Sequence, residues 1–339
     1  MVLDVILNVA LLFLLMIPGI LLKKLKMVPD GFGKGVSNLV LYIAQPALVF
    51  MAYIKDFDSK ILINSIYVFV FSIIAHVIFA VVSMLLFKGA EDSRRRMLRF
   101  ATIFSNAAFM GIPLIKEVLE DIYPGATLYA SIYNITFNLF LWTLGVRICT
   151  KDRDKDKDGI DDHTEAKAEG ASIMKALLHP VTIAAALGLL FFCFDLKSYV
   201  ADFGHLISED FELWGFVAEV FTKLGDLVAP LSMLVIGLRL PEMTFKGVLK
   251  DKFMYLFLGL RHLILPAAIL GILKLTALTG LTIDYPVAAV VLILASAPAA
   301  TSATMFAEKY DCDATYISRL VTISTLLSIV TMPLMLLFI

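Results

Sequence analysis

The sequence has few charged residues for its length. Charged side chains make up 17% of the 339 residues and hydrophobic ones 60%, and the mean hydropathy is +0.87. A soluble domain of this size carries far more charge, because water covers its whole surface. The composition therefore excludes a soluble globular protein and predicts a polytopic membrane protein embedded in the lipid bilayer.

Cysteine is also scarce, and motifs for catalysis are missing. Cys149, Cys193 and Cys312 are odd in number and lack metal-ligand spacing, so we interpret them as small apolar side chains. An intramembrane enzyme would need paired membrane aspartates, a Ser–His pair or a His-Glu-x-x-His motif, and the sequence offers none of these. We expect no enzymatic activity, no cofactor or resident metal, and no nucleic-acid partner.

Long hydrophobic runs, in contrast, are abundant. About 20 apolar residues cross the hydrocarbon layer as a helix, so the sequence predicts an all-α protein with ten transmembrane helices. The ten runs lie at 3–22, 36–54, 61–87, 97–116, 126–148, 172–194, 215–238, 252–274, 285–307 and 315–338.

Lysine and arginine are unevenly distributed between these runs. Most stand in the odd-numbered connections, for example from Lys88 to Arg99 and from Arg147 to Lys175, and few stand in the even-numbered ones. The positive-inside rule places the odd connections in the cytoplasm. We therefore expect a multi-pass protein of the plasma membrane with both termini extracytoplasmic.

Prolines recur at matching places in the two halves of the chain. Pro46 and Pro113 lie 67 positions apart, and Pro230 and Pro298 lie 68 apart, so each pair is expected to break two spans. This pattern predicts two five-helix repeats, 1–149 and 172–339, the second inverted because five is odd. Proline is also common in membrane helices generally, and the alternative is that the four positions match for that reason alone.

The two repeats are joined by the strongly polar segment 150–171. Its alternating charges are typical of a solvated cytoplasmic linker. Residues Asp154 to Glu165 also fit most of a calcium-loop pattern, although Asp161 stands where such loops usually have an apolar residue. We interpret the segment as a linker and leave calcium binding open.

The most unusual stretch is 105–113, inside the fourth apolar run. Gly111 loosens a helix, and Pro113 removes a backbone donor and collides with the preceding turn. Backbone groups that lose their helical hydrogen bonds at membrane depth are tolerated only where they are buried in protein or line a water-filled cavity. A broken helix that carries Asn106 is therefore a candidate solute site. The segment 295–301, with Pro298, is its counterpart in the second half.

These residues resemble the auxin efflux carrier family, which includes plant PIN-type auxin exporters and bacterial malate and malonate permeases. The resemblance runs over nearly the whole chain, and Asn-x-x-x-Met-Gly-Ile-Pro is its most specific part. It implies ten helices with helices 4 and 9 crossed and unwound, an elevator-like motion, and organic-anion or weak-acid substrates. It assigns substrate binding to Asn106, Gly111, Pro113 and Pro298. The other matching stretches are 38–50, 230–237, 261–266 and 297–310.

Two positions depart from the PIN-type pattern. Those proteins have an Asp and a Lys near the middle of the third helix, where this chain offers Ser72 and His76. A glutamine follows their second-crossing proline, where Ala299 stands here. These differences favour a small carboxylate over auxin.

Three further polar residues lie deep in apolar runs. Arg261 is either the counter-charge of a bound anion or a structural cation that satisfies the carbonyls of a broken helix. Asp226 and His76 are candidates for a coupling ion, H+ or Na+. An interfacial carboxylate and a hydrogen-bonded structural histidine are the alternatives.

The sequence thus predicts a secondary transporter of a small organic anion, either a dicarboxylate or an auxin-like weak acid. The substrate is expected where helices 4 and 9 cross, in contact with Ala299 and Arg261 as well as the residues above. A sodium-coupled symporter of the bile-acid type and a non-transporting solute sensor are the alternatives. Assembly as a homodimer stays open.

Overall fold

The computed structural model describes residues 10–150, 177–194, 213–242, 250–280 and 282–338, with positions 7, 174 and 196. All regular elements in this part of the chain are helical. The α-helices are α2 Met16–Lys24, α3 Phe32–Leu39, α4 Gln45–Ala52, α5 Ser59–Leu86, α6 Asp92–Ile103, α7 Ile112–Leu119, α8 Ala126–Phe140, α9 Val146–Thr150, α11 Pro180–Phe194, α13 Leu213–Asp226, α14 Val228–Arg239, α15 Lys252–Gly259, α16 Leu265–Leu278, α17 Tyr285–Ser296, α18 Ser302–Lys309 and α19 Ala314–Leu336. Wider π-helical turns are η1 Val40–Ala44, η2 Ala107–Gly111, η3 Leu141–Gly145 and η7 Leu260–Ile264.

Six helical segments in the described residues are long and apolar enough to cross a membrane. They are Phe32–Ala52, Ser59–Leu86, Ala126–Thr150, Gly215–Arg239, Lys252–Thr276 and Ala314–Met335. The helices α11 and α17 are apolar but shorter. An all-α membrane protein is therefore supported, whereas ten spans and two inverted repeats stay predictions. The linker 150–171, with its calcium-like pattern, lies outside the described residues beyond Thr150.

Three of the π-helical turns come just before a proline. Pro46 follows η1, Pro113 follows η2 and Pro266 follows η7, in each case by two residues. Proline lacks an N–H group and its ring collides with the preceding helical turn. A wider turn relieves that conflict without ending the helix.

Two of the four prolines expected to break spans therefore do not. Pro46 lies within the continuous helix Phe32–Ala52, and Pro230 lies within Gly215–Arg239. The irregularity in the latter segment falls at Leu227, between α13 and α14. The other two prolines, Pro113 and Pro298, lie in segments whose helices are interrupted, as expected.

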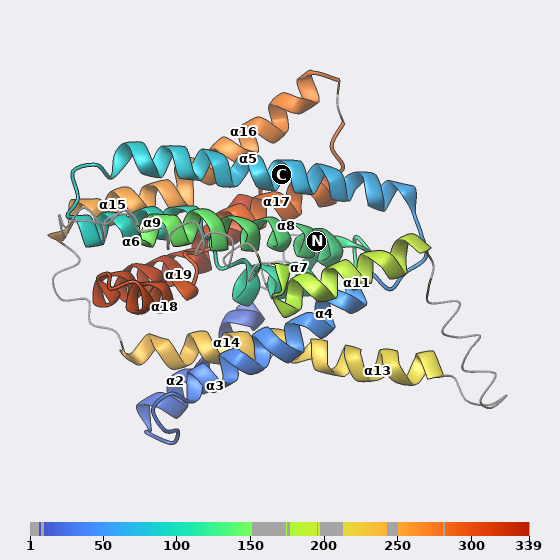
Figure 1. The fold of residues 1–339 in the computed structure, drawn as a ribbon, viewed down its shortest axis with the longest axis horizontal. Coiled ribbons are helices and arrows are strands. Elements are labelled where there is room, and N and C mark those ends of the chain that lie inside the picture. The colour runs from blue at the N-terminus through green and yellow to red at the C-terminus, as the bar shows by residue number, and fades with distance from the viewer. Residues whose placement is uncertain are drawn as a thin grey trace.

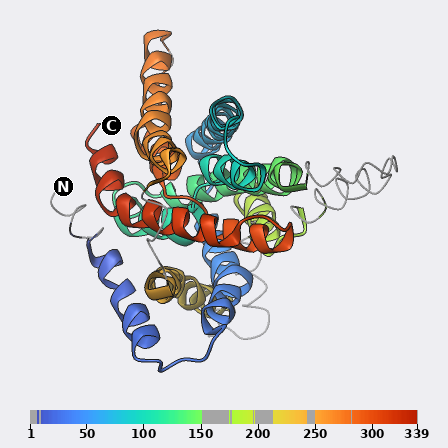
Figure 2. The ribbon, with the colours of Figure 1, turned by 90° about the vertical axis from the view of Figure 1, so that its left-hand side faces the viewer.

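The helices form two bundles, which Figure 1 and Figure 2 show one above the other. The first bundle consists of α2, α3, α4, α11, α13 and α14, which pack mainly against one another. The second bundle consists of α5 to α9 and α15 to α19. The bundles contact each other less than their own helices do, and the main contacts between them are made by α14 with η2 and α7, and by α8 with α4 and α11.

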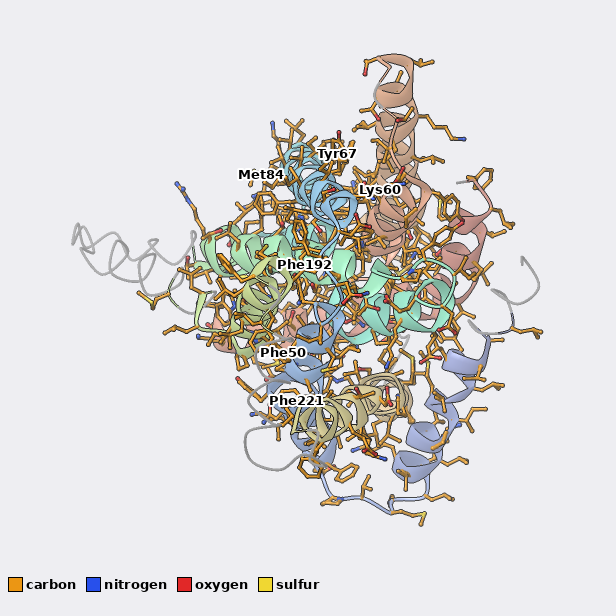
Figure 3. All side chains as sticks on the ribbon, turned by 90° about the vertical axis from the view of Figure 1, so that its right-hand side faces the viewer. Phe50, Lys60, Tyr67, Met84, Phe192 and Phe221 are labelled. Carbon is orange, nitrogen blue, oxygen red and sulfur yellow. The ribbon has the colours of Figure 1, made fainter. Side chains whose placement is uncertain are left out.

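The first bundle is held by close backbone contact and by aromatic packing. A Cβ on Gly237 would lie 2.1 Å from the carbonyl oxygen of Met16, and one on Gly19 would lie 2.3 Å from that of Leu234. Helices α2 and α14 therefore touch through glycines, as membrane helices do when they lack a hydrophobic driving force for association. Phe50 of α4 packs against Phe221 of α13, with ring centroids 5.5 Å apart (Figure 3).

Gly237→Ala is expected to destabilise the protein, because the new methyl group collides with backbone rather than with a side chain that can move. Overpacking of this kind lowers the free energy of unfolding by about 1–3 kcal/mol. We expect a lower midpoint of thermal unfolding for the purified variant in detergent. Gly271→Ala on α16 is the control, since nothing lies within 4 Å of its Cβ position. Equal midpoints for the two variants would contradict the proposed α2–α14 contact.

Candidate substrate site

Two helices of the second bundle are interrupted, and the interruptions touch. Helix α6 ends at Ile103 and the chain resumes helical structure at Ala107, while α17 ends at Ser296 and α18 begins at Ser302. Ser105 and Ala299 form an antiparallel bridge. The N–H of Asn106 donates to the carbonyl of Pro298 over 2.7 Å, and that of Ala300 donates to Phe104 over 2.9 Å.

This pairing explains how the chain can leave helical structure inside the protein. Extended backbone in a bilayer needs partners, because each unpaired N–H or C=O costs several kcal/mol. Each interruption supplies those partners to the other. Both are fully enclosed, since Ser105 and Asn106 are 2% exposed and Ala299 is 0% exposed. The crossing also lies beside the other bundle, because η2 contacts α14.

Arg261 joins the two interrupted helices at their C-terminal ends. Its Nε and Nη2 donate to the carbonyl of Ala297 over 3.0 and 2.7 Å, and Nη1 donates to that of Thr102 over 3.0 Å. Thr102 lies in the last turn of α6 and Ala297 directly follows α17, so both carbonyls belong to helix ends with negative partial charge. The side chain is fully buried. This geometry favours the structural cation over the counter-charge of a bound anion.

The amide of Asn106 is incompletely satisfied. Its Nδ2 has no hydrogen-bond partner in the described part of the chain, although the residue is buried. Because a buried amide without a partner costs about 1–3 kcal/mol, such a group is poised for a ligand. Its backbone carbonyl accepts from Met110 and Gly111, both over 3.1 Å.

Comparison with known proteins identifies the chain's family. The sequence pattern of the membrane transport protein family matches residues 4–336. The chain belongs to this family, the auxin efflux carrier family. It is 25% identical over 334 residues to an uncharacterized transporter of Methanothermobacter thermautotrophicus, covering 98% of this chain and 96% of the relative. It is 22% identical over 333 residues to an uncharacterized transporter of Methanocaldococcus jannaschii, covering 96% of each.

This family is one of membrane transport proteins and not of enzymes, so membership in it makes the chain a membrane transporter. In this chain, Gly111 allows the interrupted helices to approach, because a Cβ there would lie 2.3 Å from Leu294 Cδ2 of α17. Pro113 lies near the start of α7, two residues after the wide turn η2, which accommodates its ring and its missing N–H inside the half-helix that begins at Ala107. Pro298 supplies the carbonyl that Asn106 uses.

The backbone N–H of Ala299 is held from α19. It donates to Ser324 Oγ over 3.0 Å, and that hydroxyl is hydrogen-bonded with His262 Nε2 over 2.8 Å. His262 Nδ1 is in turn 3.0 Å from Thr331 Oγ1. Ala299 is therefore positioned at the crossing by protein contacts, and Ser324 is a supporting residue that sequence reasoning missed.

Other buried polar groups without a partner were also missed. Among them, within the residues that the structure describes, are Gln45 Oε1 on α4, Asn134 Oδ1 on α8 and Ser232 Oγ on α14. Gln45 reaches the crossing, since its Nε2 lies 3.5 Å from the carbonyl of Ala108. The available signal was a polar residue inside an apolar run, most clearly the amide directly before Pro46.

The two candidates for a coupling ion have different surroundings. Asp226 has a side chain 57% exposed and forms an ion pair with Lys116 of α7. His76 is buried, with Nδ1 2.7 Å from the carbonyl of Ser72 and a stacked ring contact with Phe140. These contacts match the roles considered as alternatives to ion coupling, an interfacial carboxylate for Asp226 and a hydrogen-bonded structural histidine for His76. Ion coupling stays a prediction.

Arg261→Gln is expected to destabilise the carrier even without substrate, because carbonyls at two helix ends lose charged donors worth about 1.5–3 kcal/mol per hydrogen bond. Thermal unfolding in detergent measures the effect. Lys252→Gln, on the exposed first turn of the same span, is the control and is expected to unfold like the unmodified protein. Unchanged stability of Arg261→Gln with weakened carboxylate binding would restore the counter-charge role.

Proposed function

We propose that this carrier moves a small organic anion, such as a dicarboxylate, across the plasma membrane and binds it where helices 4 and 9 cross. Here helix 4 is the interrupted segment 92–119 and helix 9 is 285–309. The observation that carries the proposal is the backbone pairing of Asn106 with Pro298, next to an Asn106 amide that has an unused donor.

The charge distribution at the crossing suits an anion. A carboxylate that leaves water needs replacement hydrogen bonds, because an unpaired ion in low dielectric is prohibitively costly. The half-helices beginning at Ala107 and Ser302 start at the crossing, so their positive N-terminal ends lie there. Arg261 occupies the opposite, C-terminal ends. Partial charges and neutral amides bind an anion without the tight hold of a full cation, which favours release.

The two bundles support an elevator-type motion. The crossing belongs to the second bundle, and its η2 and α7 make part of the contact with the first bundle. We propose that the second bundle carries the substrate while the first stays fixed. Sliding along this boundary would expose the crossing first to one side of the membrane and then to the other.

Two ion pairs cross the same boundary, and both come from α7 or its end. Lys116 pairs with Asp226 of α13, and Glu120 Oε1 lies 3.0 Å from Lys55 Nζ, just after α4. Burial alone would raise the pKa of Glu120, but Lys55 and the backbone N–H groups of Thr127 and Gly125 outweigh it and lower the pKa. Glu120 is therefore ionised, and both pairs must separate when the bundles slide.

Uptake of labelled malate, malonate and indole-3-acetate into proteoliposomes tests the proposed function, with and without H+ and Na+ gradients. We expect saturable uptake of a small carboxylate. Uptake that requires Na+ would indicate the symporter alternative. Uptake of none, with no thermal stabilisation by any carboxylate, would overturn the proposal in favour of a sensor.

Asn106→Ala is expected to weaken carboxylate affinity about tenfold, from the loss of a hydrogen bond to a charged group worth about 1.5–3 kcal/mol, while the folded yield stays nearly intact. Thermal-shift titration and size-exclusion yield are the measurements. Asn64→Ala is the matched amide control, because Asn64 Nδ2 already donates to Asp284 and Tyr129. It should lower stability and leave affinity unchanged. A collapse in yield of Asn106→Ala with unchanged affinity would make that amide structural.

A cross-link between the bundles is expected to stop transport without stopping binding. In a background with the native cysteines replaced, Lys116→Cys with Asp226→Cys is bridged by a bifunctional thiol cross-linker that contains a reducible disulfide, which spans the length of the lost lysine side chain, and transport should fall at least tenfold and return on reduction. Lys23→Cys with Asp30→Cys replaces an ion pair inside the first bundle, 3.1 Å long, and should transport with and without the cross-link. Full transport by the cross-linked Lys116–Asp226 variant would exclude the sliding motion.

A further inference from the structure

A strongly basic pocket lies beside α6, the helix whose other end leads into the crossing. It occupies about 400 Å³ where the end of α5 meets α6 and α9. Five of its lining residues are cationic and three are apolar. The lining residues are Met84, Lys88, Arg95, Arg96, Arg99, Leu144, Arg147 and Ile148.

Part of this positive charge is used to hold the pocket together. Arg96 Nη1 donates to the carbonyl of Cys149 over 2.5 Å, and its Nε lies 3.3 Å from Asp92 Oδ2. Arg95 also pairs with Asp92. Arg96 thereby ties the first turn of α6 to the end of α9, and it is a structural residue of the pocket.

Two further cations of the pocket, Lys88 and Arg147, are not used in this way. Lys88 and Arg147 are exposed, and neither has a carboxylate partner among the residues that the structure describes. No carboxylate appears among the described lining residues. Helix α6 begins beside the pocket at Asp92 and adds the positive end of its dipole. The positive-inside rule depends on how many cations a loop contains and does not require them to line one pocket.

The apolar lining is continuous with a surface suited to lipid chains. Met84, labelled on α5 in Figure 3, lines the pocket and is itself 36% exposed. The next residues, Leu85 and Leu86, are exposed apolar side chains at the end of the long membrane helix α5. The pocket therefore lies at the level where a spanning helix leaves the hydrocarbon, and both cations and apolar side chains line it.

We propose that this pocket binds the phosphate group of an anionic phospholipid in the cytoplasmic leaflet. Phosphate oxygens accept from Lys88 and Arg147, and the acyl chains lie against Met84 and Leu85. Basic pockets between membrane helices at this depth recognise anionic headgroups. The cytoplasmic assignment comes from the excess of lysine and arginine in the connection between α5 and α6. The site is separate from the crossing and does not depend on the transported substrate.

Native mass spectrometry of the full-length protein in detergent tests the proposal by titration with phosphatidylglycerol. We expect one molecule retained per chain, and much weaker retention of zwitterionic phosphatidylcholine. The double variant Lys88→Gln with Arg147→Gln should bind about thirtyfold more weakly, since each cation near a membrane surface contributes about one kcal/mol. Higher salt should weaken binding in the unmodified protein.

Lys24→Gln with Lys26→Gln is the matched control, because both lysines are exposed and lie outside the pocket. It should retain lipid like the unmodified protein. Arg147→Lys keeps the charge and should stay within about threefold of the unmodified affinity, since Lys serves as a point charge for phosphate. Equal thermal unfolding of all variants in lipid-free detergent shows that each is folded.

Three results would overturn the proposal. Undiminished phosphatidylglycerol retention by the Lys88 and Arg147 double variant would place the lipid elsewhere. Equal loss in the Lys24 and Lys26 control would show a diffuse charge effect. Displacement of the lipid by millimolar inorganic phosphate, with equal binding of phosphate alone, would assign the pocket to a free anion instead.

Discussion

A backbone group that leaves a helix inside a membrane protein must find another partner, and that requirement shapes the second bundle. The interruptions at 104–106 and 297–301 satisfy it by pairing with each other through the hydrogen bonds of Asn106 and Ala300. Neither interruption would be tolerable alone, because its freed groups would face apolar surroundings. The two segments, almost two hundred residues apart, therefore depend on one another for their conformation.

Arg261 completes this arrangement and divides the charge at the crossing. Its guanidinium reaches the carbonyls of Thr102 and Ala297 at once, which only a planar fork with several donors can do. The full cation is thus committed to the C-terminal ends of two helices. The opposite side of the crossing keeps the N-terminal ends and the Asn106 amide. For the anion carrier that we propose, this division would be useful, because the N-terminal side would attract the substrate without holding it permanently.

The crossing also lies where the two bundles meet. Its η2 segment touches α14, and Gln45 of α4 reaches Ala108. Lys116 and Glu120 bring charge from the same half-helix to the first bundle. The sliding motion that we propose would take place along this boundary, and the close glycine contact between α2 and α14 suits the first bundle to the fixed role.

Sequence reasoning located the interruptions through Pro113, Pro298 and Asn106, because proline weakens a helix in an apolar run and a buried amide there needs a hydrogen-bond partner. It was wrong about Pro46 and Pro230, since a helix can accommodate proline without a break and local sequence does not reveal the wide turn before Pro46. The sequence around Arg261 is compatible with both roles considered for it, so only its distances to the carbonyls of Thr102 and Ala297 distinguish them. Gln45, Asn134 and Ser232 were missed because their missing partners are a property of the packed structure.

Composition and charge distribution by themselves determined that this is an α-helical membrane protein, and its motifs determined the family. These properties depend on the solvent and on residues adjacent in the chain, which the sequence records directly. Only the tertiary structure decided which backbone groups pair across the crossing, where Arg261 directs its charge, and how basic residues gather between α5, α6 and α9. Those features depend on distances between segments remote in the chain, and the packing of the helices sets such distances.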